Sequence, residues 1–219
     1  MARSEVEKHF DTIAAKYDFY TKKRNLHYSS LKKLLKTFIP PGKTIFDVGC
    51  GTGDLLASLK PKFGYGMDIS TRMIAISKIK YQKSKNLQFS TKWPEKKFDY
   101  IFMADVIEHL ENPKDIFKSI SRLMDKNTTL ICIMANPLWK PVLMIAEKLK
   151  LKMPEGPHNR IKNHELRIIL EEAGLKIVKH NYKLLIPVKI PFITDFANKY
   201  LEKWFKWLAF IEYFIAVRA

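Results

Sequence analysis

Short apolar runs alternate with stretches of helical periodicity along nearly all of this chain. The runs are rich in β-branched and aromatic residues, which is typical of buried strands, whereas apolar residues three and four positions apart predict amphipathic helices. This alternation indicates an α/β domain whose helices cover a largely parallel sheet. Strands are expected at 44–48, 65–68, 87–89, 98–104, 128–135, 175–186 and 210–218, and helices at 5–17, 28–38, 71–81, 113–124 and 164–173.

A glycine-rich turn follows the first expected strand. Gly49, Gly51 and Gly53 occupy alternate positions after the strand, and an apolar-periodic helix begins near Asp54. Glycines lack a Cβ atom, so the backbone can turn sharply and approach a ligand closely. The start of the helix also offers free N–H groups. This half of a βαβ unit predicts a nucleotide-like ligand over the carboxyl end of the strand.

An acidic residue follows the second expected strand. Asp68 lies 21 positions after Asp47, which belongs to the first expected strand. A carboxylate about 20 residues beyond a glycine loop can accept hydrogen bonds from ribose hydroxyls. The glycine spacing is G-x-G-x-G, not the G-x-G-x-x-G of dinucleotide-binding folds. Together these features resemble the cofactor motifs of the class I S-adenosylmethionine (SAM) methyltransferases.

The resemblance implies an architecture and a reaction. The fold would be a three-layer, Rossmann-like α/β sheet of seven strands, six parallel and one antiparallel, and the reaction would convert SAM to S-adenosylhomocysteine. One domain would span residues 1–219, with a helical cap at 1–40, a SAM-binding core at 41–136 and a substrate-side half at 137–219 that carries an insert at 187–208 with a helix in it. Cofactor contacts are implied for Tyr17, Asp47, Gly49, Cys50, Gly51, Gly53, Asp68, Ile69 and Ala104.

The first helix carries a second resemblance. Residues 9–18 resemble the F-D-x-x-A-x-x-Y-D start of small-molecule methyltransferases, including those of ubiquinone and menaquinone synthesis. In that family the helix closes over the cofactor, which makes Tyr17 a candidate contact. The alternative is an amphipathic helix in which Tyr17 only packs.

The end of the fourth expected strand supplies candidate catalytic residues. Asp105 and His109 stand four positions apart, so a helical turn would place both on one side, and their segment resembles the strand-four end of these enzymes. Methyl transfer from a sulfonium needs an aligned acceptor and, where required, removal of its proton. His109 suits this role because its pKa lies near neutrality. Alternatively, His109 caps a helix. A further alternative is that Asp105-x-x-Glu108-His109 binds a metal ion, as a similar motif does in one subgroup of relatives, but the preferred interpretation is a site without a metal.

Two further segments bear on ligands. Relatives often carry an acidic residue that contacts adenine after the third strand, but Ser90 and Thr91 stand there, and Trp93 is predicted either to cover the ring or to pack. The loop at 153–160 is rich in turn formers and lies where many relatives place a substrate-facing insert. His158 and Arg160 are the candidate acceptor contacts, with simple exposure as the alternative.

Composition narrows the choice of partner. A hydrophobic content of 47% excludes disorder, and a net charge of +17 favours anionic partners. The basic residues are mostly lysine, which argues against specific nucleic-acid reading. The chain has two cysteines without a disulfide or metal-site pattern, and its start is polar and lacks a signal sequence. Both features favour a cytoplasmic location. The oligomeric state is not predicted.

The segment at 187–208 combines an apolar helical stripe with lysines. It is expected to lie in a membrane interface, to cap an apolar pocket or to pack on the sheet. The preferred acceptor is therefore a small molecule, lipid-linked or isoprenoid, handled on the inner face of the membrane. The alternatives are an RNA methyltransferase and a SAM-binding protein without catalysis.

Overall fold

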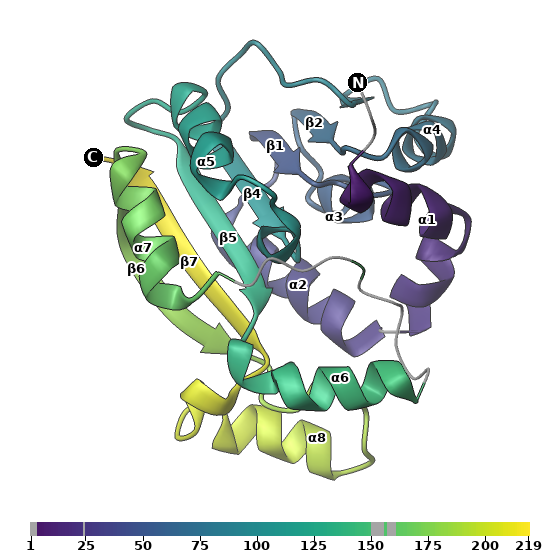
Figure 1. Ribbon diagram of the computed structural model, residues 1–219, viewed down its shortest axis with the longest axis vertical. Coiled ribbons are helices and arrows are strands. Elements are labelled where there is room, and N and C mark those ends of the chain that lie inside the picture. The colour runs from purple at the N-terminus through teal and green to yellow at the C-terminus, as the bar shows by residue number, and fades with distance from the viewer. Residues whose placement is uncertain (1–3, 24, 150–155, 157–160) are drawn as a thin grey trace.

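The computed structural model describes residues 4–23, 25–149, 156 and 161–219. It contains a seven-stranded sheet of order β3-β2-β1-β4-β5-β7-β6, with helices on both faces (Figure 1). The expected α/β fold with a seven-stranded sheet is confirmed. The strands are β1 (Thr44–Val48), β2 (Phe63–Met67), β3 (Leu87–Ser90), β4 (Tyr100–Ala104), β5 (Thr129–Ala135), β6 (Leu175–Lys183) and β7 (Ile211–Arg218).

The connections between strands create a crevice beside β1. Strands β1 to β5 pair in parallel, and β7 pairs antiparallel with both β5 and β6. The chain runs outward from β1 through β2 to β3 and then returns to place β4 on the other side of β1. Ligands of open α/β sheets bind at such a switch point, beyond the carboxyl ends of the strands. The glycine turn after β1 and Asp105 after β4 both lie there.

Helices form at all five expected positions, and the first two are longer than expected. None of the helices in the described part of the chain combines the length and the apolar character needed to cross a membrane. The helices are α1 (Glu5–Lys23), α2 (Asn25–Phe38), α3 (Asp54–Ser58), α4 (Thr71–Lys80), α5 (Pro113–Arg122), α6 (Lys140–Lys148), α7 (Asn163–Glu172) and α8 (Ile193–Phe196).

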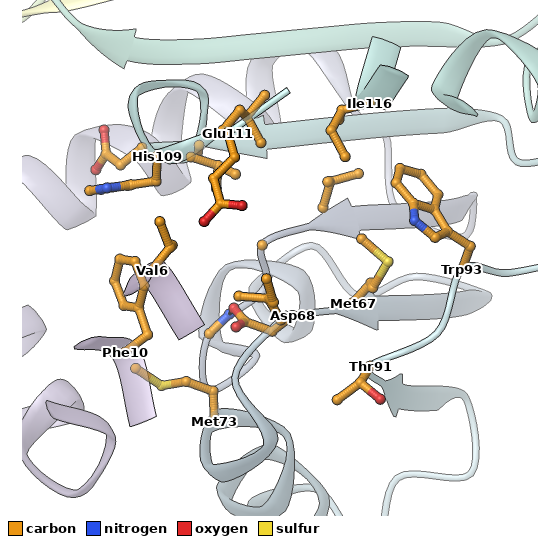
Figure 2. Close-up of a pocket in the computed structure, with 18 of the residues that line it drawn as sticks. Val6, Phe10, Met67, Asp68, Met73, Thr91, Trp93, His109, Glu111 and Ile116 are labelled. Atoms are coloured by element: carbon orange, nitrogen blue, oxygen red, sulfur yellow. Dashed lines mark hydrogen bonds between the residues drawn. The ribbon is translucent and has the colours of Figure 1, made fainter. Parts of the chain in front are cut away.

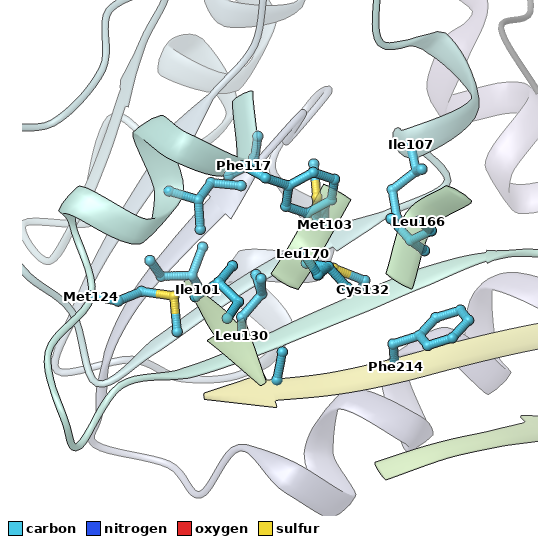
Figure 3. Packing of buried hydrophobic residues seen from close by; sticks show 14 of the residues in the cluster. Ile101, Met103, Ile107, Phe117, Met124, Leu130, Cys132, Leu166, Leu170 and Phe214 are labelled. Atoms are coloured by element: carbon cyan, nitrogen blue, oxygen red, sulfur yellow. The ribbon is translucent and has the colours of Figure 1, made fainter. Parts of the chain in front are cut away.

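Alternation along the central strands builds two apolar layers. Ile101 and Met103 of β4 join the cluster beneath α5 and α7, which also contains Phe117 and Leu170 (Figure 3). Phe102, between them, joins the cluster on the opposite face, beneath α2 and α3. Successive side chains of a strand point to opposite faces, so a strand covered on both sides is apolar throughout.

The insert at 187–208 carries a helix, but the helix is short and irregular and does not continue along the whole apolar stripe from Ile193 to Leu208. After α8 the chain forms a π-helical turn (Ala197–Leu201) and a short 3-10 turn (Lys206–Leu208). The large side chains of the apolar stripe also do not pack on the sheet, because Phe196 and Tyr200 are exposed, although Ala197 of the stripe is buried. Polar side chains occupy the inner side of the segment, where they bind the backbone of the preceding loop.

Candidate active site

A cavity of about 380 Å³ opens beyond the carboxyl ends of β1, β2 and β4 (Figure 2). Helix α1 contributes one wall, and the segment after β4 together with the start of α5 contributes another. Most of the wall is apolar, with a few carboxylates and one imidazole. The lining residues are Val6, Phe10, Tyr17, Val48, Gly49, Gly51, Met67, Asp68, Ile69, Met73, Thr91, Trp93, Ala104, Asp105, Val106, His109, Leu110, Glu111, Asn112, Asp115 and Ile116.

The glycine turn brings backbone to the cavity where a side chain would not fit. Gly49 has φ +78°, and a Cβ atom there would stand 2.4 Å from Cγ2 of Val106. A Cβ atom on Gly51 would stand 3.1 Å from the ring of Tyr17. The N–H groups of Gly49 and Cys50 both donate to the Met67 carbonyl, at 2.7 and 2.9 Å. The turn is therefore held to β2, and its glycines leave space for a ligand.

Asp68 links the glycine turn to the end of β2. Its Oδ2 accepts the Gly51 N–H at 2.8 Å, and its Oδ1 accepts the Ser70 N–H at 2.9 Å. Burial raises the pKa of Asp68 to about 6, although these two hydrogen bonds act in the opposite direction. Each carboxylate oxygen has a second lone pair. Asp68 can thus hold the loop and still accept hydrogen bonds from a ligand in the cavity that it lines.

Six of the nine predicted cofactor contacts line the cavity, and three do not. Asp47, Cys50 and Gly53 are absent from its wall. Burial raises the pKa values of both Asp47 and the Cys50 thiol well above their usual range. A Cβ atom on Gly53 would instead meet the ring of Phe89 at 2.6 Å. Asp47 and Cys50 are buried away from the cavity, and Gly53 packs against Phe89 instead.

Helix α1 is fastened to the cofactor side by two carboxylates. Asp11 accepts hydrogen bonds from the Ser70 hydroxyl at 2.6 Å and the Arg72 N–H at 3.1 Å. Asp18 accepts the Thr52 hydroxyl at 2.5 Å and the Lys80 ammonium at 2.6 Å. These contacts hold the helix across the cavity, so Tyr17 both lines the cavity and packs over the glycine turn. The sequence analysis assigned no role to either carboxylate.

Asp105 and His109 reach the cavity from different local structures. Asp105 has φ +56°, and its N–H donates to the Ile133 carbonyl at 3.0 Å. His109 ends a short 3-10 turn (Ile107–His109), and its ring meets the edge of the Phe10 ring at 5.0 Å. The two residues therefore do not share one helical turn, contrary to expectation. Both nevertheless line the same cavity.

His27, which the sequence analysis missed, stands behind Asp105. Its Nε2 lies 2.7 Å from Oδ2 of Asp105, and the imidazole is buried in α2. In the described part of the chain its buried Nδ1 has no hydrogen-bond partner. A proton on that nitrogen would be costly, which favours the tautomer that donates from Nε2 to the Asp105 carboxylate. The two residues lie 78 positions apart, and no local pattern connects them.

The opposite end of the cavity is lined by Thr91 and Trp93. The Trp93 ring also meets the edge of the Phe46 ring at 5.8 Å, so it packs on the core and forms cavity wall at once. Among the residues the structure describes, no group of three or more His, Cys, Asp or Glu side chains could hold a metal ion. His158 and Arg160, the predicted acceptor contacts, lie outside the described residues.

The cavity fits SAM in shape and in charge. The absence of Cβ atoms at Gly49 and Gly51 leaves room for a ligand against the backbone. Asp68, Asp105, Glu111 and Asp115 line the wall and suit a cationic sulfonium. SAM would be held by Asp68 and the glycine turn, at the switch point of the sheet.

This fold and this cavity are those of the SAM-dependent methyltransferases. The profile of the methyltransferase domain family matches residues 20–180. The chain belongs to this family, its cofactor is SAM, and the resemblance seen in the motifs is confirmed. The ubiquinone biosynthesis O-methyltransferase of Coxiella burnetii is 27% identical over 197 residues, which cover 77% of this chain and 83% of that enzyme.

Two solved structures share the fold at lower identity. Magnesium protoporphyrin IX methyltransferase of Synechocystis, with bound S-adenosylhomocysteine, is 20% identical with a TM-score of 0.64, over 98% of each chain. A Haloferax volcanii protein solved in complex with the Trm112 methyltransferase activator is 17% identical with a TM-score of 0.71. That alignment covers 95% of this chain and 97% of the other. At such identities the likeness shows the fold alone.

Proposed function

We propose that the protein methylates a small-molecule acceptor, lipid-linked or isoprenoid, that enters the cavity in front of Asp105 and His109. The observation that carries this proposal is the cavity in which a SAM-type loop stands beside His109 and beside Asp105, which His27 backs. Apolar side chains of α1 (Val6 and Phe10) form part of its wall, which suits an apolar acceptor. The similarity to a ubiquinone biosynthesis O-methyltransferase supports this substrate class.

Each group has a separate task in this proposal. Bound SAM supplies an electrophilic methyl group on its sulfonium. Asp68 accepts hydrogen bonds from the ribose, and the glycine turn positions the amino-acid end of the cofactor. Asp105 or His109 accepts the proton that an acceptor hydroxyl or amine loses. His27 keeps the Asp105 carboxylate oriented toward the cavity.

The test is transfer of label from methyl-labelled SAM into fractions of a cell extract. Label in the lipid or small-molecule fraction, lost with Asp105→Asn or with His109→Asn, is the expected result. Equal labelling by wild type and by both variants would contradict the assigned roles. SAM binding by calorimetry should be retained in both variants, which separates catalysis from cofactor binding.

RNA is the alternative acceptor, and the net charge of +17 favours it. Neutralised phosphates release counterions, so RNA binding should weaken steeply with salt, with a slope set by the number of phosphate contacts. Label in the RNA fraction together with such a slope would replace the small-molecule proposal. The Trm112-bound neighbour also makes a small activator protein a candidate partner, which co-purification would detect.

A further inference from the structure

Residues 188–208 and α6 expose an unusual number of apolar side chains at one end of the molecule. We call this surface the outer face and define it by Phe192, Phe196, Tyr200, Trp204, Trp207 and Ile145. Phe192 is 91% exposed and Trp204 is 73% exposed. Helices α6 and α8 lie side by side there (Figure 1). The Trp139 indole N–H, just before α6, donates to the Leu208 carbonyl at 2.8 Å and joins the two segments.

Polar side chains on the inner side of the same segment, beside the buried Ala197, form hydrogen bonds with the preceding loop. The Thr194 hydroxyl donates to the Val188 carbonyl at 2.7 Å and accepts the Ile190 N–H at 2.8 Å. Four residues on, the Asn198 side chain binds both the N–H and the carbonyl of Ile186, at 2.8 and 3.0 Å.

Another four residues on, the pattern repeats at Glu202. Its carboxylate accepts the Leu184 N–H at 2.7 Å and the Lys183 ammonium at 2.6 Å. Positions 194, 198 and 202 are thus fixed inward by hydrogen bonds. The interleaved apolar positions 196, 200 and 204 are directed outward as a consequence, because side chains two positions apart cannot share a helical face.

Phe192 combines an exposed ring with a strained backbone conformation. Its φ of +62° is a conformation that residues with a Cβ atom rarely adopt, and nearly all of its side chain is in contact with solvent. Strained residues of this kind concentrate at functional positions. Contiguous exposed apolar surface likewise marks a site of interaction.

The charges on the outer face select the partner. Lys199 lies over the ring of Tyr200 at 5.1 Å, and Lys203 lies over the ring of Trp204 at 5.7 Å. The cores of protein–protein interfaces are depleted in lysine. Aromatic rings interleaved with lysines are instead typical of segments that lie in the interface of an anionic membrane.

We propose that the outer face docks on an anionic lipid bilayer, with its rings among the acyl chains and its lysines at the head groups. Strands β4 and β5 are parallel, so α6 follows the same carboxyl edge of the sheet that carries the cavity. An acceptor held in the bilayer would therefore be presented on the side of Asp105. This inference deepens the proposed function, but its test requires no methyl acceptor.

The experiment is sedimentation of the protein with vesicles, without SAM. Wild type should bind vesicles of equal parts phosphatidylcholine and phosphatidylglycerol and should bind pure phosphatidylcholine at least about tenfold more weakly. The combined variant Phe196→Ser, Trp204→Ser and Trp207→Ser should lose at least about tenfold in binding to the anionic vesicles. Phe19→Ser is the matched control, since Phe19 is an exposed aromatic residue of α1 outside the outer face.

A second pair of variants separates docking from net charge. Lys199→Glu with Lys203→Glu should weaken binding more than Lys78→Glu with Lys83→Glu, although both pairs lower the net charge equally. The proposal would be overturned if the wild-type protein did not bind anionic vesicles. It would also be overturned if the combined variant of Phe196, Trp204 and Trp207 bound them as the wild type does. So would a ring variant that changes a dimer to a monomer in sedimentation equilibrium without a change in vesicle binding. Calorimetry with SAM on the same variants separates the two proposals, because SAM binding tests the enzyme assignment whether or not the protein binds vesicles.

Discussion

The glycine turn after β1 and the insert at 187–208 both depart from regular structure, but for opposite reasons. At the glycine turn, carboxylates are buried and Gly49 and Gly51 have no side chains, which leaves space for a ligand against the backbone. At the insert, Thr194, Asn198 and Glu202 bind the backbone from the inside, and large apolar side chains are displayed outside. The first arrangement receives a ligand. The second presents a surface to a partner, and its polarity is reversed relative to an ordinary surface helix.

The largest effect is expected from adding one methyl group to the turn. Gly49→Ala should lower the free energy of unfolding by roughly 2–5 kcal/mol, because it combines an unfavourable φ with overpacking against Val106. SAM binding should be lost as well. Thermal or urea unfolding and calorimetry measure both.

Gly42→Ala is the matched control for this substitution. Gly42 has nearly the same φ, +77° against +78°, but nothing stands within 4 Å of its added Cβ atom. It should therefore cost only the conformational part, about 1–2 kcal/mol, and leave SAM binding intact. Equal losses in the two variants would show that close packing of the turn is unimportant.

The next largest effect concerns the carboxylate at the end of β2. Asp68→Ala should weaken SAM binding by roughly ten- to a hundredfold, because charged hydrogen bonds to the ribose are worth about 1.5–3 kcal/mol. Burial raises the pKa of Asp68 to about 6, and these hydrogen bonds require the ionised form. Affinity should thus fall as the pH drops through 6, and Asp68→Asn should abolish that dependence in calorimetry.

The stability of the cofactor-free protein should depend on pH in the opposite sense. Between the ordinary pKa of an aspartate and about 6, the folded state binds the Asp68 proton more tightly than the unfolded state does. This contribution of Asp68 to the free energy of unfolding is present at low pH and is lost as the pH rises through 6.

The affinity for SAM tests the ribose role of Asp68. A SAM affinity that stays constant from pH 5 to pH 8 (about the range in which a shifted carboxylate titrates) would argue against that role.

The glycine turn and the insert also differ in how much of each could be predicted from the sequence. Gly49, Gly51 and Asp68 line the cavity as predicted, because binding a nucleotide-like ligand constrains residue type at a fixed spacing. His27 was missed, and Asp11 and Asp18 matched a motif without an assigned role, because their partners lie 78, 59 and 34 positions away and only the folded chain brings them together. The apolar stripe of the insert was detected, but periodicity does not tell which side of a stripe faces the protein.

A smaller effect is expected from the residue behind Asp105. His27→Leu should lower kcat by roughly tenfold, since the carboxylate loses the group that orients it, while the Kd for SAM stays unchanged. The acidic limb of the pH profile of kcat should move as well. His27→Gln, which retains a donor, should recover part of the rate. A fall in kcat together with unfolding at lower temperature, and without rescue by Gln, would instead indicate a purely structural residue.

The smallest effect is expected at Phe192, where a substitution tests whether the exposed apolar surface of the insert lowers the stability of the protein. Phe192→Gly should raise the free energy of unfolding by about 0.5–1 kcal/mol, because glycine relieves the φ of +62° and the lost ring buries almost nothing. Lys60→Gly is the control, with φ +51° and an exposed side chain outside the outer face. Both should stabilise the protein in urea unfolding, but only Phe192→Gly should weaken binding to anionic vesicles. A destabilised Phe192→Gly variant would mean that the ring packs in solution, and the contrast between the two regions would then disappear.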